Sequence, residues 1–158
     1  MRQVHVEDLL DYIDEHEGEE GASLYLQKEF QAVSYCLSLA GVSIGNKLKH
    51  AQTFNAGVIT STVLKDPHTK QNVSLGSYEV FHASYKQLLA NQQSLSQITT
   101  EQLKQVVSPQ YKLFSGASPY IYHSVADLEL VYPMVIKTAA FYLAAIAQKS
   151  AVLSYVCG

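Results

Sequence analysis

The sharpest chemical motif in this sequence is a serine between two glycines, Gly41-Val42-Ser43-Ile44-Gly45. In serine hydrolases, the G-x-S-x-G pattern holds a nucleophilic serine on a strained turn between a strand and a helix. The reaction also needs an orienting acid and then a histidine base further along the chain. Asp66 and His123 follow Ser43 in that order. These three residues therefore form a candidate catalytic set, provided that a strand precedes Gly41.

The segment before Gly41 carries two competing periodicities. Residues 33–39 alternate between large apolar and smaller side chains, which is typical of a strand. A longer pattern runs from Leu26 to Ala40, where apolar residues step by four and three beside a parallel polar line, as in an amphipathic helix. The helical pattern extends farther, and it explains the two glycines as a bend or a close-packing site. Helix is favoured, but the sequence leaves residues 33–40 open.

A second motif, Glu79-Val80-Phe81-His82, has the E-x-x-H spacing of one half of a carboxylate-bridged di-iron site. Such a site needs a second E-x-x-H and two more inward glutamates, and the sequence has no second copy. We therefore interpret Glu79 and His82 as a pair on a helix surface. No metal or other cofactor is predicted.

The first 20 residues hold eight acidic residues and one arginine, a net charge of −7, whereas the other 138 have a net charge of +4. Asp11, Asp14 and Glu15 fall on one face of a predicted helix, where magnesium ligands could lie. A magnesium site of that kind needs a second acidic helix, and six acids in 138 residues do not supply one. These three carboxylates are therefore a solvated face or a binding surface for a protein partner.

An aromatic segment forms the second candidate binding surface. Tyr120, Tyr122 and His123 lie close together in a predicted loop before the last helix. Tyrosine combines apolar area with a hydroxyl group, which suits a partner surface, a ligand pocket, or a loop packed against a core.

Composition and charge narrow the class of protein. The chain has 158 residues, 47% of them hydrophobic, and no linker-like region, so it reads as one globular domain over 1–158. It has a single arginine and scattered lysines, so it lacks the clustered basic surface with which proteins bind nucleic acids. Two separate cysteines and no apparent signal peptide favour a cytoplasmic protein with free thiols.

The elements expected to position these residues are mainly helical. The spacing predicts an acidic amphipathic helix within 1–20, further helices over 23–40, 78–91, 100–107 and 124–155, and a β-hairpin near 57–76 that turns at Asp66-Pro67-His68. Thr100 and Ser124 are the predicted caps of the last two helices, a Gln-rich connection precedes Thr100, and Pro109 begins a predicted loop. The last helix is apolar almost all round, its most polar line being Lys137, Phe141, Ala144 and Gln148. Charge and a proline interrupt it too often for a membrane span, so we expect a core helix or a homodimer contact.

The predicted fold is a compact bundle of about five helices with one small hairpin. The leading hypothesis for function is a non-catalytic protein-interaction module, such as an adaptor, an immunity-type inhibitor or a regulatory subunit, with a homodimer through the C-terminal helix as one form of the contact. The alternatives are a small serine hydrolase that uses Ser43 and a sensor domain that binds a small molecule between helices.

Overall fold

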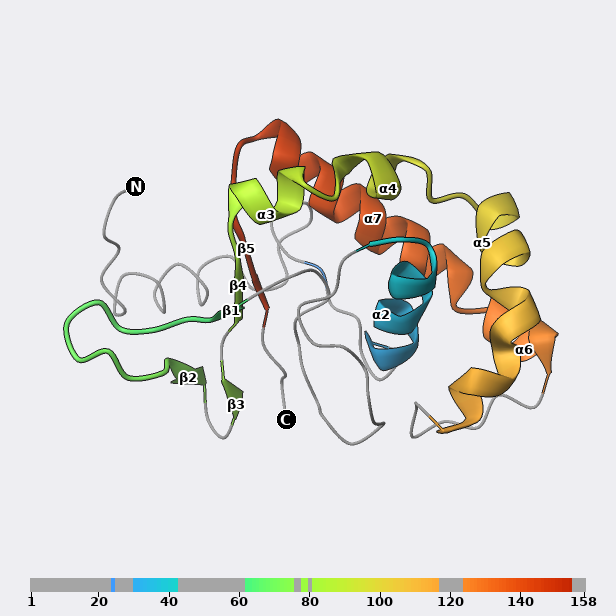
Figure 1. Ribbon diagram of the computed structural model, residues 1–158, viewed down its shortest axis with the longest axis horizontal. Helices are drawn as coiled ribbons and strands as arrows, with labels where there is room; N and C mark the ends of the chain where they lie inside the picture. Colours follow the sequence, from blue (N-terminus) through green and yellow to red (C-terminus); the bar gives the residue numbers. More distant parts are fainter. Residues whose placement is uncertain are drawn as a thin grey trace.

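The computed structural model describes residues 24, 30–42, 62–75, 78–79, 81–116 and 124–154 (Figure 1). Over these ranges the chain is mainly helical with small antiparallel sheets, which confirms the predicted fold class. The predicted N-terminal helix within 1–20 lies outside the described residues.

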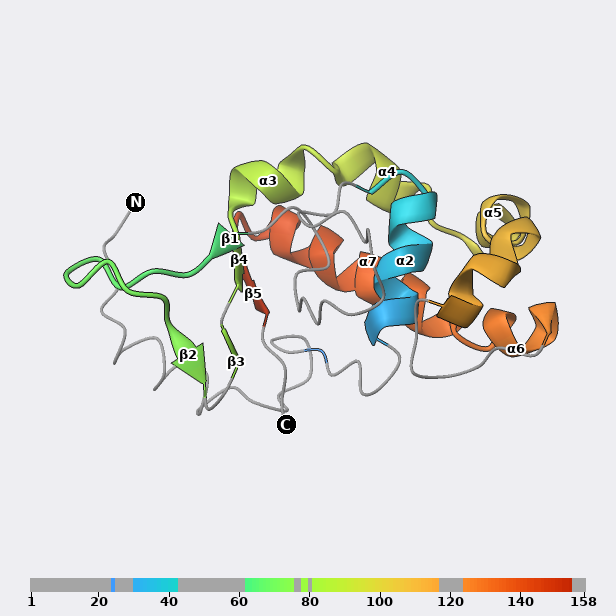
Figure 2. The same ribbon diagram turned by 60° about the horizontal axis from the view of Figure 1, so that its bottom comes forward.

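The long helix α7 (Tyr132–Ala147) is the central element of the helical region. Four other helices contact it: α2 (Phe30–Leu39), α3 (Tyr85–Leu89), α4 (Gln92–Ser96) and α5 (Thr100–Val106). Figures 1 and 2 show α3 and α4 running along the upper edge of α7, α2 below it in Figure 1 and across it in Figure 2, and α5 beside its N-terminal end. Apolar residues that are far apart in sequence therefore meet in one core.

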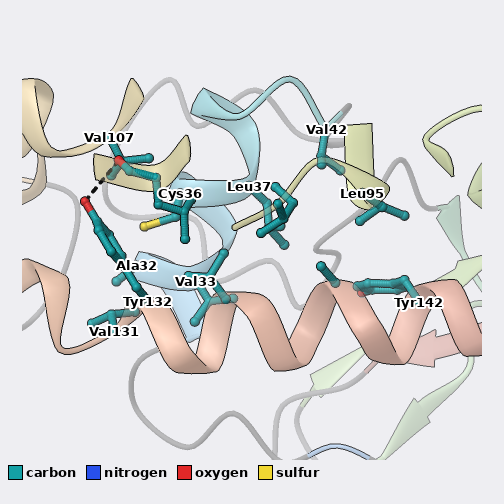
Figure 3. Packing of buried hydrophobic residues seen from close by; sticks show 14 of the residues in the cluster. Ala32, Val33, Cys36, Leu37, Val42, Leu95, Val107, Val131, Tyr132 and Tyr142 are labelled. Atoms are coloured by element: carbon teal, nitrogen blue, oxygen red, sulfur yellow. Dashed lines mark hydrogen bonds between the residues drawn. The ribbon is translucent and has the colours of Figure 1, made fainter. Parts of the chain in front are cut away.

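The core forms where α2 lies against α7 (Figure 3). Val33, Cys36 and Leu37 of α2 are fully buried there, close to Val135 and Tyr142 of α7. Each of the short helices α3, α4 and α5 adds one fully or almost fully buried leucine, namely Leu88, Leu95 and Leu103. The short helices thus depend on α7, because helices this short are unstable alone in water.

The segment before Gly41, which the sequence left open between helix and strand, is a helix over residues 30–39. They form helix α2, with Ala32, Val33, Cys36 and Leu37 buried at helical spacing. Gly41 then takes a φ of 95°, a left-handed conformation that glycine adopts without steric cost, and the helix ends there.

The predicted hairpin is present, with shorter arms. Lys65 pairs with Asn72, and Val73 N–H donates to the Leu64 carbonyl, so residues 64–73 fold back on themselves. The Asp66 carboxylate closes the turn by accepting hydrogen bonds from His68 N at 2.8 Å and Thr69 N at 3.2 Å. Before the turn, β1 (Thr62–Val63) pairs with β4 (Phe81–Ala83) rather than with the return arm.

Residues 78–83 were predicted as the start of a helix, and this prediction is wrong. They form β3 (Tyr78–Glu79), which pairs with β2 (Ser74–Leu75), and then β4. Phe81 and Ala83 are buried while His82 between them is half-buried, which is the period of a strand. Strands β1 and β5 (Val152–Ser154) flank β4 in an antiparallel sheet, so tertiary pairing overrides the local helical spacing.

Capping side chains determine where α3 and α5 begin. Ser84 and Gln87 form a reciprocal capping box, with Ser84 N–H donating to Gln87 Oε1 at 2.8 Å and Gln87 N–H to Ser84 Oγ at 3.2 Å. Thr99, one residue before the predicted cap, accepts a hydrogen bond from Gln102 N and starts α5. The Gln-rich segment predicted as a connection contains the short helix α4.

The last predicted helix, over 124–155, is three elements. Ser124 caps α6 (Val125–Glu129) as expected, but a turn at Leu130 and Val131 separates α6 from α7. Helix α7 ends at Ala147, and Lys149 then adopts a φ of 53° before the chain enters β5. The predicted loop after Pro109 contains the 3-10 segment η2 (Ser108–Gly116).

Candidate functional site

The side of α7 that points away from the core is the most distinctive surface among the described residues. We define the outward face of α7 by its exposed positions at helical spacing, which are Pro133, Lys137, Ala140, Ala144 and Ala147. Lys137 is the single charged residue among them. The predicted polar line of this helix follows almost the same direction, although Phe141 within it is only half exposed. This face is therefore exposed but nearly without charge.

The apolar character of the helix extends beyond what the core requires. Within the part of the chain that the structure describes, the helical stretch Val125–Ala147 is long and apolar enough to cross a membrane by length and composition alone. Only 39% of its most apolar 18-residue window is buried. Core helices of folded domains meet the same criteria, and α7 packs against four other helices along its inner side.

Leu130 adds a large apolar side chain at one end of the outward face. It is 79% exposed, whereas Leu89 on α3, the other exposed large hydrophobic residue among those described, is 42% exposed. Leu130 lies in the α6–α7 turn, three residues before Pro133 and seven before Lys137. An exposed leucine next to an apolar helix face is typical of a contact surface.

A buried polar cluster lies directly beneath this turn. We call Ser108, Glu129 and Tyr132 the Ser108 cluster. The Ser108 hydroxyl is 2.6 Å from the Tyr132 hydroxyl and donates to Glu129 Oε1 at 3.1 Å. The Tyr132 hydroxyl also donates to the Leu103 carbonyl at 3.3 Å, the hydrogen bond drawn as a dashed line in Figure 3. One serine thereby joins η2 to the end of α6 and the start of α7.

Burial raises the pKa of two groups at this cluster, the Tyr132 phenol and the Cys36 thiol. Burial is the largest cause of the raised pKa of Tyr132, the hydrogen bond between Tyr132 and Ser108 partly offsets it, and Cys36 and Glu129 add to the rise. Burial also raises the pKa of the Cys36 thiol, to about 12. In Figure 3 the Cys36 sulfur points toward the Tyr132 ring. A nucleophilic thiolate or phenolate is thus disfavoured here, which favours a structural role for the cluster over a catalytic one.

The structural context required by the hydrolase hypothesis is missing. The element before Gly41 is the helix α2 and not a strand, so the strand-to-helix turn of a nucleophilic serine is not formed there. Asp66 lies in the hairpin turn, where its carboxylate binds two backbone N–H groups of its own loop. Ser43 and His123 lie outside the described residues.

The other residues singled out from the sequence are placed only in part. Asp11, Asp14, Glu15, Tyr120 and Tyr122 lie outside the described ranges. The E-x-x-H pair was assigned to a helix wrongly, because Glu79 is in β3 and His82 is in β4. Burial lowers the pKa of His82, which favours its neutral form. Among the described residues, no group of three or more His, Cys, Asp or Glu side chains could hold a metal ion.

Sequence reasoning missed the Ser108 cluster and the exposure of Leu130. Glu129 and Tyr132 are three residues apart, a spacing that would have placed them on one side of a continuous helix. Ser108, however, comes 21 residues before Glu129, and nothing in the intervening sequence indicates that the two meet. Leu130 belonged to an apolar run, so it was expected inside a helix and not at an exposed turn.

Comparisons of this chain with protein-family models, with curated proteins and with solved structures found no match.

Proposed function

We propose that this protein is a non-catalytic protein-interaction module that binds through the outward face of α7, with a second copy of the chain as the partner. The observation that carries the proposal is the combination of an almost uncharged exposed helix face with Leu130 at its end, 79% exposed. Covering exposed apolar surface of this kind with another protein removes it from water and lowers the free energy.

The residue types on the face favour a helix as the contact. Ala140, Ala144 and Ala147 have short side chains, so a second helix can approach the α7 backbone closely along this line. Symmetric pairs are the commonest protein oligomers, and an antiparallel pair of α7 helices would bring the same face of both copies together. In such a pair centred near Ala140, Lys137 of one copy lies beside Ala144 of the other and not beside a second lysine.

Sedimentation velocity over a series of protein concentrations tests this proposal. We expect the wild-type protein to form dimers as the concentration rises, and Ala140→Glu to shift the protein to monomers, because a buried unpaired carboxylate at the contact is costly. Ala90→Glu, an exposed alanine at the end of α3, is the matched control and should dimerise like the wild type. A wild-type protein that stays monomeric at high micromolar concentration would exclude the second copy as the partner.

The acidic segment within 1–20 is a second proposed contact, with a different partner chemistry. Its charge of −7 suits a basic protein surface, and Asp11, Asp14 and Glu15 share one side of the predicted helix. Reversing these three charges to lysine should weaken a complex with a basic partner, and the difference should shrink with added salt, since salt screens exposed charges. Loss of α7-mediated dimers is not expected from these changes, so the two contacts can be tested separately.

A further inference from the structure

The exposure of Leu130 contrasts with the burial of both its neighbours. Val131 is only 5% exposed and Tyr132 only 1% exposed, and both belong to the core. On the other side, Glu129 accepts the hydrogen bond of Ser108. Burying the leucine side chain would lower the free energy of the protein, yet the residues on either side of it occupy the inward positions of this turn.

A single hydroxyl group connects the two sides of this turn. Ser108 Oγ reaches Glu129 at the end of α6 and Tyr132 at the start of α7, and these two residues flank Leu130 and Val131. Ser108 itself is 8% exposed and opens η2, directly after the end of α5. The turn is thus tied at both ends to one point on a neighbouring element.

We infer that Ser108 is a positioning residue that holds the α6–α7 turn so that Leu130 points into solvent. Ser108 acts on the turn through its hydrogen bonds to Glu129 and Tyr132. Without the Ser108 hydroxyl, the Glu129 carboxylate loses this hydrogen bond, and the Tyr132 hydroxyl keeps only the one to the Leu103 carbonyl. That Leu130 then contacts a partner rests on the proposed function. The orientation of Leu130 does not, and it can be measured in the monomer.

The experiment is electron paramagnetic resonance of a nitroxide attached at Leu130→Cys, in a Cys157→Ser background. Cys36 is fully buried with a thiol pKa of about 12, so it does not compete for the label. The label is compared in the parent protein, in Ser108→Ala and in Tyr132→Phe, at concentrations where each protein is monomeric. We expect the ratio of the immobile component, from a label turned toward the protein, to the mobile component to rise about fivefold in both variants, the usual effect of one hydrogen bond on a local equilibrium.

Thr138→Val is the matched control. Thr138 is 1% exposed and its hydroxyl donates to the Met134 carbonyl at 2.7 Å, so this variant also removes a buried hydroxyl from α7 but leaves the turn untouched. A larger immobile component in Ser108→Ala and Tyr132→Phe, with Thr138→Val unchanged, supports the inference. An unchanged or smaller immobile component in the first two, or an equal increase in all three, overturns it. If Ser108→Ala does not fold, Tyr132→Phe tests the same hydrogen bond from its other end.

Failure of this inference is distinct from failure of the proposed function. A label that is mobile in the parent protein and becomes immobile in Ser108→Ala, together with an exclusively monomeric wild type, would remove the dimer while leaving Ser108 as the positioning residue. Conversely, if the dimer forms through α7 but label mobility ignores Ser108, the contact stands and the positioning role is wrong. Where both hold, Ser108→Ala should weaken dimerisation about fivefold without changing the helical content measured by circular dichroism.

Discussion

The helical core around α7 and the hairpin over 64–73 are stabilised in different ways. The core joins α2 to α7, about a hundred residues apart in sequence, through side chains such as Leu37 and Val135 that are fully buried. The hairpin projects from the rest of the molecule in both Figures 1 and 2, and most of its turn is exposed. Within it, Asp66 accepts hydrogen bonds from two residues close in sequence, and the side chain of Val73 at its base is buried.

This difference predicts which changes act on the whole molecule and which act locally. Removing apolar volume from the core weakens every element that packs on α7, whereas breaking the hairpin turn frees a segment that is mostly exposed. Global unfolding should therefore report on the core, and hydrogen exchange of individual amides should report on the hairpin.

The largest expected effect is that of Leu37→Ala. Leu37 is fully buried between α2 and α7, so the truncation should lower the free energy of unfolding by about 3 kcal/mol, through lost burial and the cavity left behind. Val73→Ala, at the base of the hairpin, should cost roughly half as much. Chemical denaturation measures both. Equal losses would contradict the distinction between a global core and a local hairpin.

The next effect is a loss of stability at alkaline pH that depends on Cys36. The pKa of its thiol rises from 9.0 to about 12 on folding, so the folded state holds this proton after the unfolded state has released it. Stability is therefore unaffected below pH 9 and falls as pH rises toward 12, by about 1.4 kcal/mol at pH 10 relative to pH 8. Cys36→Ala should remove this part of the slope. If the free energy of unfolding falls equally with rising pH in the wild type and in Cys36→Ala, Cys36 does not contribute to this pH dependence.

A smaller and local effect is expected from Asp66→Ala. The carboxylate accepts hydrogen bonds from two backbone N–H groups, at His68 and Thr69, and losing them should destabilise the turn by about 1 kcal/mol. Amide exchange within residues 68–73 should accelerate while amides of α7 remain protected. Asp66→Asn, which keeps the accepting oxygen, is the control. Faster exchange throughout the protein would mean that the hairpin supports the core after all.

The smallest effect is a gain in stability from Lys70→Gly. Lys70 has a φ of 62°, a left-handed conformation that costs free energy for any residue with a Cβ atom. Glycine relieves this cost but adds freedom to the unfolded chain, so the net gain should be about 0.5 kcal/mol. Slower amide exchange in the hairpin alone would show it. A Lys70→Gly hairpin that opens more easily would mean that the turn does not strain the lysine.

Several features could be predicted because they depend on neighbouring residues. The step of four and three through Val33 and Leu37 indicated a helix, and the Asp66-Pro67-His68 turn indicated a hairpin; both are present. Ser124 was identified as a cap because a hydroxyl before a helix binds an orphan backbone N–H. Local side-chain chemistry is enough to specify such features.

Other features depended on pairing across the chain. Residues 78–83 have apolar side chains that suit either a helix or a strand. The strand conformation of β4 is stabilised by its pairing with β1 on one side and β5 on the other. In the same way, the end of α7 at Ala147 freed residues 152–154 to pair with β4. Periodicity within one segment does not contain information about its pairing partners, and so the last helix was predicted too long.

The sequence by itself determined a mainly helical domain, an apolar C-terminal helix whose most polar line points outward, and a hairpin turn at Asp66. Only the tertiary structure decided that this helix breaks at Leu130, that the leucine remains exposed, and that Ser108 meets Glu129 and Tyr132 beneath it. The physical reason is the range of the interactions. Helix periodicity and caps act over three or four residues, whereas the Ser108 cluster forms only when packing brings η2, α6 and α7 together.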